Sequence, residues 1–143
     1  MQDTPIIVNT SILINATLDE VWDAVTNPIT VKKYFFGTDM VTDWSIGNPI
    51  YFRGTWEGKP YEDKGIVKTF VPGQSLSYTY KAGSDERPDV PENYYLVTYT
   101  VAQKDMGVEL SISQTSDDAE KAKHSEGNWN MLLGEIKKLL ETK

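Results

Sequence analysis

Residues 115–140 read TSDDAEKAKHSEGNWNMLLGEIKKLL, and this stretch decides the fold that we expect. Within it, one set of residues recurs every three or four positions, the spacing that aligns side chains along one side of an α-helix. The set consists of Ala119, Ala122, Glu126, Trp129, Leu133, Ile136 and Leu140, with Leu132 and Leu139 beside its second half. A helix with one mostly apolar side needs an apolar surface to cover. We therefore predict a long helix over residues 115–140 that packs on a sheet formed by earlier segments.

The N-terminal quarter predicts a strand followed by two short helices. Apolar side chains mark a strand over residues 6–14. Thr17 and Glu20 have the spacing of a capping box, in which each side chain accepts a hydrogen bond from the other residue's backbone amide at a helix start. Asn27-Pro28 ends this first helix, because a residue before proline avoids the helical conformation. The same pair can start a second helix, which stops at Gly37.

The middle of the chain alternates strand patterns with turn residues. Strands are expected over residues 40–44, 49–56, 61–71, 76–80, 94–101 and 108–112. Short strands joined by tight turns are typical of an antiparallel meander. With the terminal helix they predict an α+β fold of the helix-grip type: a curved antiparallel β-sheet wrapped around a long C-terminal α-helix, with two short helices after the first strand. No linker or repeat divides the chain, so we expect one domain over residues 1–143.

Composition limits the function classes. The chain has 143 residues, a net charge of −7, one histidine and no cysteine, which excludes disulfides, thiolate catalysis and cysteine metal sites. The negative charge disfavours nucleic acid and anionic membrane surfaces as partners. No apolar run approaches the ~18 residues of a membrane span. Residues 1–5 lack the features of a secretory signal. We therefore expect a cytoplasmic protein that needs no metal and no cofactor.

Several motifs spread along the chain carry a family resemblance. They are LDEVWDAVTNP at residues 18–28, VKKYF at 31–35, GIV at 65–67, PGQSL at 72–76, and the segment from Trp129 to Leu140. In this order they resemble the SRPBCC superfamily of START-like, helix-grip domains, and within it the branch of the heat shock protein 90 ATPase activator homologues. The chain departs from that branch where Gly127 stands one position earlier than usual before Trp129, and where residues 106–110 lack the usual Gly-Thr pair.

The resemblance implies a deep cavity between the sheet and the last helix, where family members bind small hydrophobic or amphipathic molecules. We accordingly expect a binding domain rather than an enzyme, acting as a monomer or homodimer. Two alternatives stay open: a co-chaperone-like module with a chaperone partner, and a small cyclase or hydrolase that uses a cavity carboxylate or tyrosine. The branch has no invariant catalytic set, so no catalytic residue is assigned. Because one scaffold hosts many unrelated sites, the fold alone does not determine the function.

Aromatic side chains are the largest signal for a ligand cavity. The chain holds eight Tyr, four Phe and four Trp, and tyrosine suits a pocket with apolar walls and a few hydrogen-bonding tips. Alternating tyrosines are also ordinary packing in strands. The candidate cavity residues are Phe35, Phe36, Phe52, Arg53, Trp56, Tyr78, Tyr80, Tyr95, Tyr99, Glu126, Trp129 and Leu133. We expect the cavity under the N-terminal half of the long helix, with Trp129 at the boundary between cavity and core.

Two polar side chains, Glu126 and Arg53, have competing interpretations. Glu126 falls on the sheet-facing stripe, where it could bind the polar head of a ligand or act as an acid or base. Alternatively, a local loosening of the helix turns it toward solvent. Arg53 either holds a ligand carboxylate or pairs across strands with Glu62 or Asp63, which is the more frequent arrangement. The single histidine, His124, falls off the stripe and is expected to be exposed.

Overall fold

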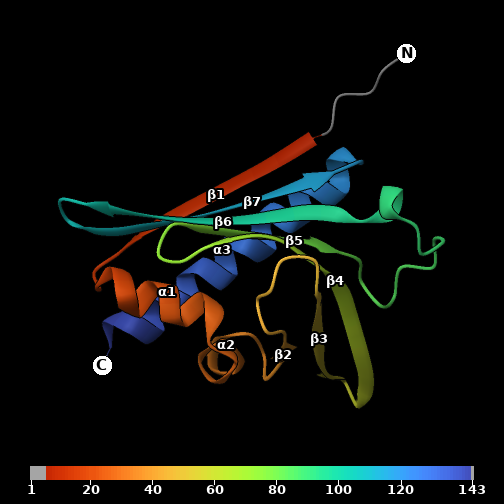
Figure 1. The fold of residues 1–143 in the computed structure, drawn as a ribbon, viewed down its shortest axis with the longest axis horizontal. Helices are drawn as coiled ribbons and strands as arrows, with labels where there is room; N and C mark the ends of the chain where they lie inside the picture. The colour runs from red at the N-terminus through yellow and green to blue at the C-terminus, as the bar shows by residue number, and fades with distance from the viewer. Residues whose placement is uncertain (1–5, 143) are drawn as a thin grey trace.

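A long C-terminal helix lies against a seven-stranded sheet (Figure 1). The computed structural model describes residues 6–142, apart from the side chain of Trp56. The elements in chain order are β1 (Ile6–Ile14), α1 (Leu18–Thr26), α2 (Pro28–Tyr34), β2 (Asp39–Val41), β3 (Pro49–Trp56), β4 (Lys59–Val71), β5 (Ser75–Tyr80), η1 (Pro91–Asn93), β6 (Tyr95–Lys104), β7 (Gly107–Ser116) and α3 (Ala119–Glu141). The predicted α+β, helix-grip fold class is confirmed.

The sheet is antiparallel and bends sharply along β4. Its strand order is β1-β7-β6-β5-β4-β3-β2, so only β1 leaves its sequence neighbours, crossing over to pair with β7. The first part of β4 pairs with β3 and the last part with β5, with a register shift between Val67 and Thr69. Gly65 lies where the two parts meet, and a Cβ atom there would stand 1.5 Å from the carbonyl oxygen of Thr79. A glycine is therefore required for the bend, which turns the β3–β4 hairpin away from β6 and β7 (Figure 1).

The core lies between the sheet and the helices. On β7, alternate residues Val108, Leu110 and Ile112 are almost completely buried, as expected for a strand with one face on a core. On α3, Leu133 and Ile136 are equally buried, and this helix packs mainly against β1 and β7. Burial of each such side chain stabilises the fold by about 1.5–3 kcal/mol. The C-terminal half of α3 is thus the part that anchors the helix to the sheet.

The helix starts follow the predicted capping chemistry. The Glu20 amide donates to the Thr17 hydroxyl at 3.1 Å, and the Thr17 amide donates to the Glu20 carboxylate at 2.9 Å. Asn27 then caps α2 by accepting a hydrogen bond from the Ile29 amide at 3.0 Å, with Pro28 in the first turn. Both caps satisfy amides that would otherwise lack a helical partner. These local signals confirm the two short helices predicted after the first strand.

Some predicted boundaries were wrong. The long helix begins at Ala119, four residues later than predicted, because Thr115 and Ser116 still pair with β1 and Asp118 caps the helix. The second helix ends at Tyr34, short of Gly37. β2 is also shorter than predicted, and β6 continues to Lys104. These shifts leave the order of the elements unchanged.

Two further observations bear on the expectations from composition. Within residues 6–142, no helix combines the length and the apolar character that a membrane crossing requires. The expected lack of a secretory signal concerns residues 1–5, which lie outside the described residues.

Candidate functional site

A pocket of about 1030 Å³ lies between α3, the adjoining strands and the segment after α2. Its lining residues are Phe35, Phe36, Phe52, Tyr78, Tyr80, Ala82, Ser84, Tyr95, Gln114, Ser116, Glu120, Lys121, His124, Ser125, Asn128, Trp129, Met131 and Leu132. The contribution of α3 runs from Glu120 to Leu132, which is its N-terminal half. The buried C-terminal half of α3 lies beyond the pocket and contributes to the core instead.

A continuous row of aromatic rings backs the apolar side of the pocket. Phe35 stacks on Phe52 with centroids 6.1 Å apart, and Phe52 meets Tyr78 at 5.5 Å. Tyr78 contacts Tyr99 at 6.1 Å, and Tyr99 meets the edge of Trp129 at 5.9 Å. We call these five residues the aromatic wall. Aromatic pairs of this kind contribute about 0.5–1.5 kcal/mol each beyond burial, so the wall is held in place without a ligand.

Polar side chains of β7 and α3 also line the pocket and form its polar side. Lys121, Ser125 and Asn128 follow one another at spacings of four and three residues, so they lie along one side of the helix. The Trp129 indole N–H donates to the Gln114 side-chain oxygen at 2.8 Å. The Gln114 side-chain nitrogen in turn donates to the Ser125 hydroxyl at 3.4 Å. These bonds fix the orientation of the Trp129 ring at the junction of the polar side and the aromatic wall.

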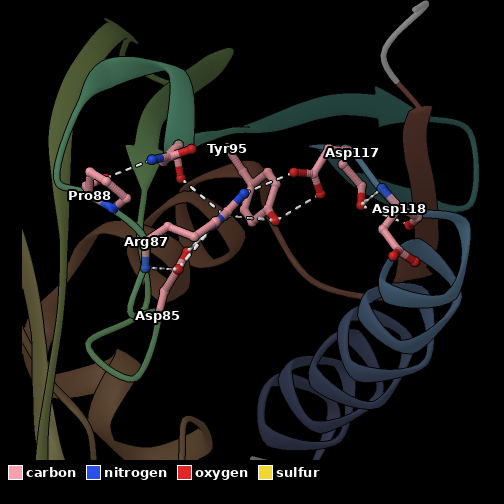
Figure 2. A network of polar contacts seen from close by, with 8 residues as sticks. Asp85, Arg87, Pro88, Tyr95, Asp117 and Asp118 are labelled. Carbon is pink, nitrogen blue, oxygen red and sulfur yellow. Dashed lines mark hydrogen bonds and ion pairs between the residues drawn. The ribbon is translucent and has the colours of Figure 1, made fainter.

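A network centred on Arg87 attaches the β5–β6 loop to Asp117, in the short connection between β7 and α3 (Figure 2). The guanidinium donates to Asp85 through two nitrogens, at 3.0 and 2.8 Å, and to Asp117 at 2.9 Å. The Tyr95 hydroxyl also donates to Asp117, at 3.1 Å. Hydrogen bonds from Arg87 hold the pKa of the Asp85 carboxyl below its usual range. The network thereby positions Tyr95 and the loop residue Ser84, which both line the pocket.

The buried tyrosines stay protonated at neutral pH. Burial raises the pKa of Tyr78, and it raises the pKa of Tyr99 to about 12 although a hydrogen bond with Tyr78 lowers it. Burial and the nearby Asp63 carboxylate likewise raise the pKa of Tyr80, whose hydroxyl donates to Asp63 at 2.6 Å. A phenol with a raised pKa is a hydrogen-bond donor and an apolar surface, and it is a poor candidate for a general base at pH 7.

Most of the sequence-predicted site residues meet in this pocket. Those that line it are Phe35, Phe36, Phe52, Tyr78, Tyr80, Tyr95 and Trp129. Tyr99 instead lines a second, small cavity that shares Phe35, Phe52 and Tyr78 with the pocket. Leu133 is 1% exposed and belongs to the core.

Two further predicted site residues lie away from the pocket. Glu126 is exposed and does not line it, which agrees with the solvent-facing alternative considered from the sequence and not with the sheet-facing one. Compared with the stripe expected from the sequence, the buried side of α3 is rotated toward Ser125 and Leu132. Glu126 therefore lies outside the buried side. Arg53 is also exposed and pairs with Glu62 at 2.6 Å, the cross-strand alternative considered from the sequence. The side chain of the remaining candidate, Trp56, lies outside what the structure describes.

The sequence prediction missed the polar half of the pocket. The missed residues include Gln114, Ser116, Lys121, His124, Ser125 and Asn128. His124 is exposed, as expected, yet it contributes to the lining. Lys121, Ser125 and Asn128 each come one position before a stripe residue, namely Ala122, Glu126 and Trp129. This shared spacing was the signal in the sequence that could have identified them. In the described part of the chain, no group of three or more His, Cys, Asp or Glu residues is arranged to hold a metal ion.

A long helix held against a bent antiparallel sheet defines the helix-grip class of START-like domains. Within this class, the family model described as Activator of Hsp90 ATPase homolog 1-like protein matches residues 15–141. The chain therefore belongs to that family.

Solved structures with the same fold include both near and distant relatives. The solution structure of ChR145 from Cytophaga hutchinsonii is 40% identical, with a TM-score of 0.85 over 98% of this chain and 97% of that one. The Aha1 dimer from Colwellia psychrerythraea is 15% identical, with a TM-score of 0.74 over 96% and 97% of the two chains. MLL2253 from Mesorhizobium loti is 19% identical, with a TM-score of 0.76 over 96% and 99%. No protein with a curated description matches the chain in sequence.

Proposed function

We propose that this protein binds a small molecule with an apolar, ring-containing body in the pocket between α3 and the sheet. The observation that carries the proposal is the aromatic wall beside a pocket of about 1030 Å³. Binding sites for small ligands typically enclose about 300–1,000 Å³ and are lined by apolar and aromatic side chains with a few polar groups. A pocket of this size and lining fits a ligand of several fused or linked rings.

Binding, and not turnover, is the proposed activity. Burial raises the pKa of the pocket phenols Tyr78 and Tyr80, which disfavours them as bases, and Glu126, the carboxylate considered for acid–base chemistry, lies outside the pocket. Glu120 and His124 also line the pocket, but both side chains are exposed, and neither is a buried group of the kind that acid–base catalysis tunes. The proposal includes a cytoplasmic location and a single binding domain that acts as a monomer or homodimer.

A fluorescence titration with the neutral probe N-phenyl-1-naphthylamine tests the proposal. We expect saturable binding at one site and a raised melting temperature, because a ligand that binds only the folded state stabilises it. Asn128→Phe places a ring in the pocket mouth and should weaken binding about ten-fold or more. Asn130→Phe makes the same change at an exposed position of α3 that does not line the pocket, and should leave binding unchanged.

Two outcomes would overturn the proposal. One is the absence of saturable binding to the folded wild-type protein. The other is an equal loss of affinity in the Asn128→Phe and Asn130→Phe variants, because the probe would then bind somewhere other than the pocket. Circular dichroism spectra of both variants establish that they are folded.

A chaperone-interaction module is the second candidate function, and two exposed apolar side chains favour it. Ile29 is the second residue of α2, and Phe36 follows the end of this helix by two residues. Their side chains are 72% and 57% exposed. The family description and the Aha1 relative point to the same class of partner. This function predicts that the protein stimulates the ATPase of an Hsp90 from its own cell and that Ile29→Asp removes the stimulation. An unchanged ATPase rate, with no Hsp90 retained in a pull-down, would contradict it.

A further inference from the structure

We infer that the pocket selects molecules whose apolar body carries one negatively charged group, and that Lys121 binds this group. The inference rests on the proposed function and adds the chemical class of the ligand. It comes from the unequal distribution of polar side chains around the pocket. The aromatic wall, of which all residues but Tyr99 line the pocket, forms one side, and the polar side chains of Lys121, Ser125 and Asn128 form another. A ligand that fits both sides has an apolar body with a polar end directed toward α3.

The free polar groups at that end are mostly hydrogen-bond donors. Gln114 uses its side-chain oxygen to accept from Trp129 and its nitrogen to donate to Ser125. Ser116 donates to the Asp118 carbonyl oxygen at 3.1 Å and accepts from the Asp118 amide at 3.4 Å. The Ser125 hydroxyl accepts from Gln114, so its own hydrogen is free to donate. With the Lys121 ammonium and the Asn128 amide, this side presents donors to a ligand that supplies acceptors.

The other cations near the pocket already have partners. Arg87 is bound by Asp85 and Asp117 (Figure 2). Lys81 is buried, and its ammonium donates to the Asp85 carbonyl oxygen at 2.7 Å. Lys121, in contrast, takes part in no ion pair among residues 6–142. Lys121 is therefore the cation that remains available for a charged group of a bound ligand.

The charge of the whole protein makes this selectivity testable. At a net charge of −7, the molecule repels small anions in general. An anionic ligand that binds more tightly than its neutral counterpart must therefore gain local interactions that outweigh this repulsion, and the ion pair with Lys121 is the charged one among them. Glu120, which also lines the pocket, is the carboxylate that such a ligand has to avoid.

Two probes with the same ring body test the inference. N-phenyl-1-naphthylamine is neutral, and 8-anilinonaphthalene-1-sulfonate adds one sulfonate to that body. We expect the wild-type protein to bind the sulfonate probe more tightly. Lys121→Gln should lower the affinity for the sulfonate probe about five-fold, as expected for loss of a partly exposed ion pair. It should change the affinity for the neutral probe less than about two-fold. Glu120→Gln should strengthen binding of the sulfonate probe.

Lys123→Gln is the matched control. It removes the same charge from an exposed position two residues away that does not line the pocket, and it should leave both probes unchanged. Equal losses for Lys121→Gln and Lys123→Gln would overturn the inference, because the effect would then be one of general surface charge. An unchanged sulfonate affinity in Lys121→Gln would also overturn it. If either outcome occurs while the neutral probe still binds, the inference about Lys121 fails and the proposed function stands. If neither probe binds, the proposed function fails as well.

Discussion

Trp129 connects the pocket to the core through both its ring and its N–H group. The ring meets Tyr99 edge to face, and the N–H donates to Gln114. The same side chain lines the pocket, one turn before the fully buried Leu133. Its contribution to stability and its contribution to the site can be separated by substitutions that remove one feature at a time.

Trp129→Ala is expected to lower the free energy of unfolding by about 3 kcal/mol, because it removes a packed ring and leaves a space behind. Trp129→Phe keeps an aromatic ring and loses the hydrogen bond to Gln114, so the expected loss is about 1 kcal/mol. Urea denaturation followed by circular dichroism measures both values. Similar losses in the two variants would contradict the importance of ring packing at this position.

Glu126 and Ser125 show where prediction from single residues failed. The three-and-four spacing identifies a buried side of a helix, but it does not state how far that side is rotated. Ser125 and Glu126 lie on opposite sides of the line through Ala122 and Trp129, and only Ser125 turns toward the pocket. Their difference depends on the position of β7 and the β5–β6 loop beside the helix, which is tertiary information that the local sequence does not contain.

At the scale of elements, the bend in β4 depends on one close contact. Gly65 lies against the backbone of Thr79, where no side chain fits. Gly65→Ala should therefore disrupt the pairing of β4 with β5 and strongly destabilise the fold. Gly127→Ala is the matched control, because a Cβ atom there meets nothing within 4 Å and α3 should gain about 0.5–1 kcal/mol. Thermal denaturation of both variants measures the contrast, and a neutral Gly65→Ala would contradict the account of the bend.

The loop between β5 and β6 is held by a network whose strength depends on pH. Partial burial raises the pKa of Asp117, but the hydrogen bonds from Tyr95 and Arg87 outweigh it, so the pKa lies below its usual range. A carboxyl with a lowered pKa in the folded state stabilises the fold above its unfolded pKa, near 3.9, and this contribution disappears as the pH falls through the folded pKa.

Asp117→Asn should accordingly reduce the free energy of unfolding at pH 7 and have a progressively smaller effect below about pH 4. Urea denaturation across this pH range measures the difference from wild type. Glu135→Gln, at an exposed position of α3, is the control and should show no such convergence. A constant difference between wild type and Asp117→Asn from pH 7 to pH 3 would contradict the ionic role of Asp117.

At the scale of the whole molecule, much of the architecture was predictable because its signals are local. The caps at Thr17 and Asn27 and the strand alternation were all readable along the chain, and the helix-grip fold followed from their order. The aromatic half of the pocket was also accessible, since Phe52, Tyr78, Tyr80 and Tyr95 lie on strands and Trp129 lies on the apolar stripe of the long helix. The polar half was not, because it forms only where β7, the loop with Arg87 and the start of α3 come together.

The central claim is that the space under the N-terminal half of α3 binds a small molecule. Mapping of amide chemical shifts by NMR during titration with N-phenyl-1-naphthylamine tests it most directly. The account predicts saturable shifts concentrated in residues 120–132 of α3 and at Tyr78, Tyr80 and Tyr95, with little change on the opposite face of the sheet. Saturable shifts confined to other parts of the molecule would contradict it. The absence of shifts at the highest soluble concentration of the probe would contradict it as well.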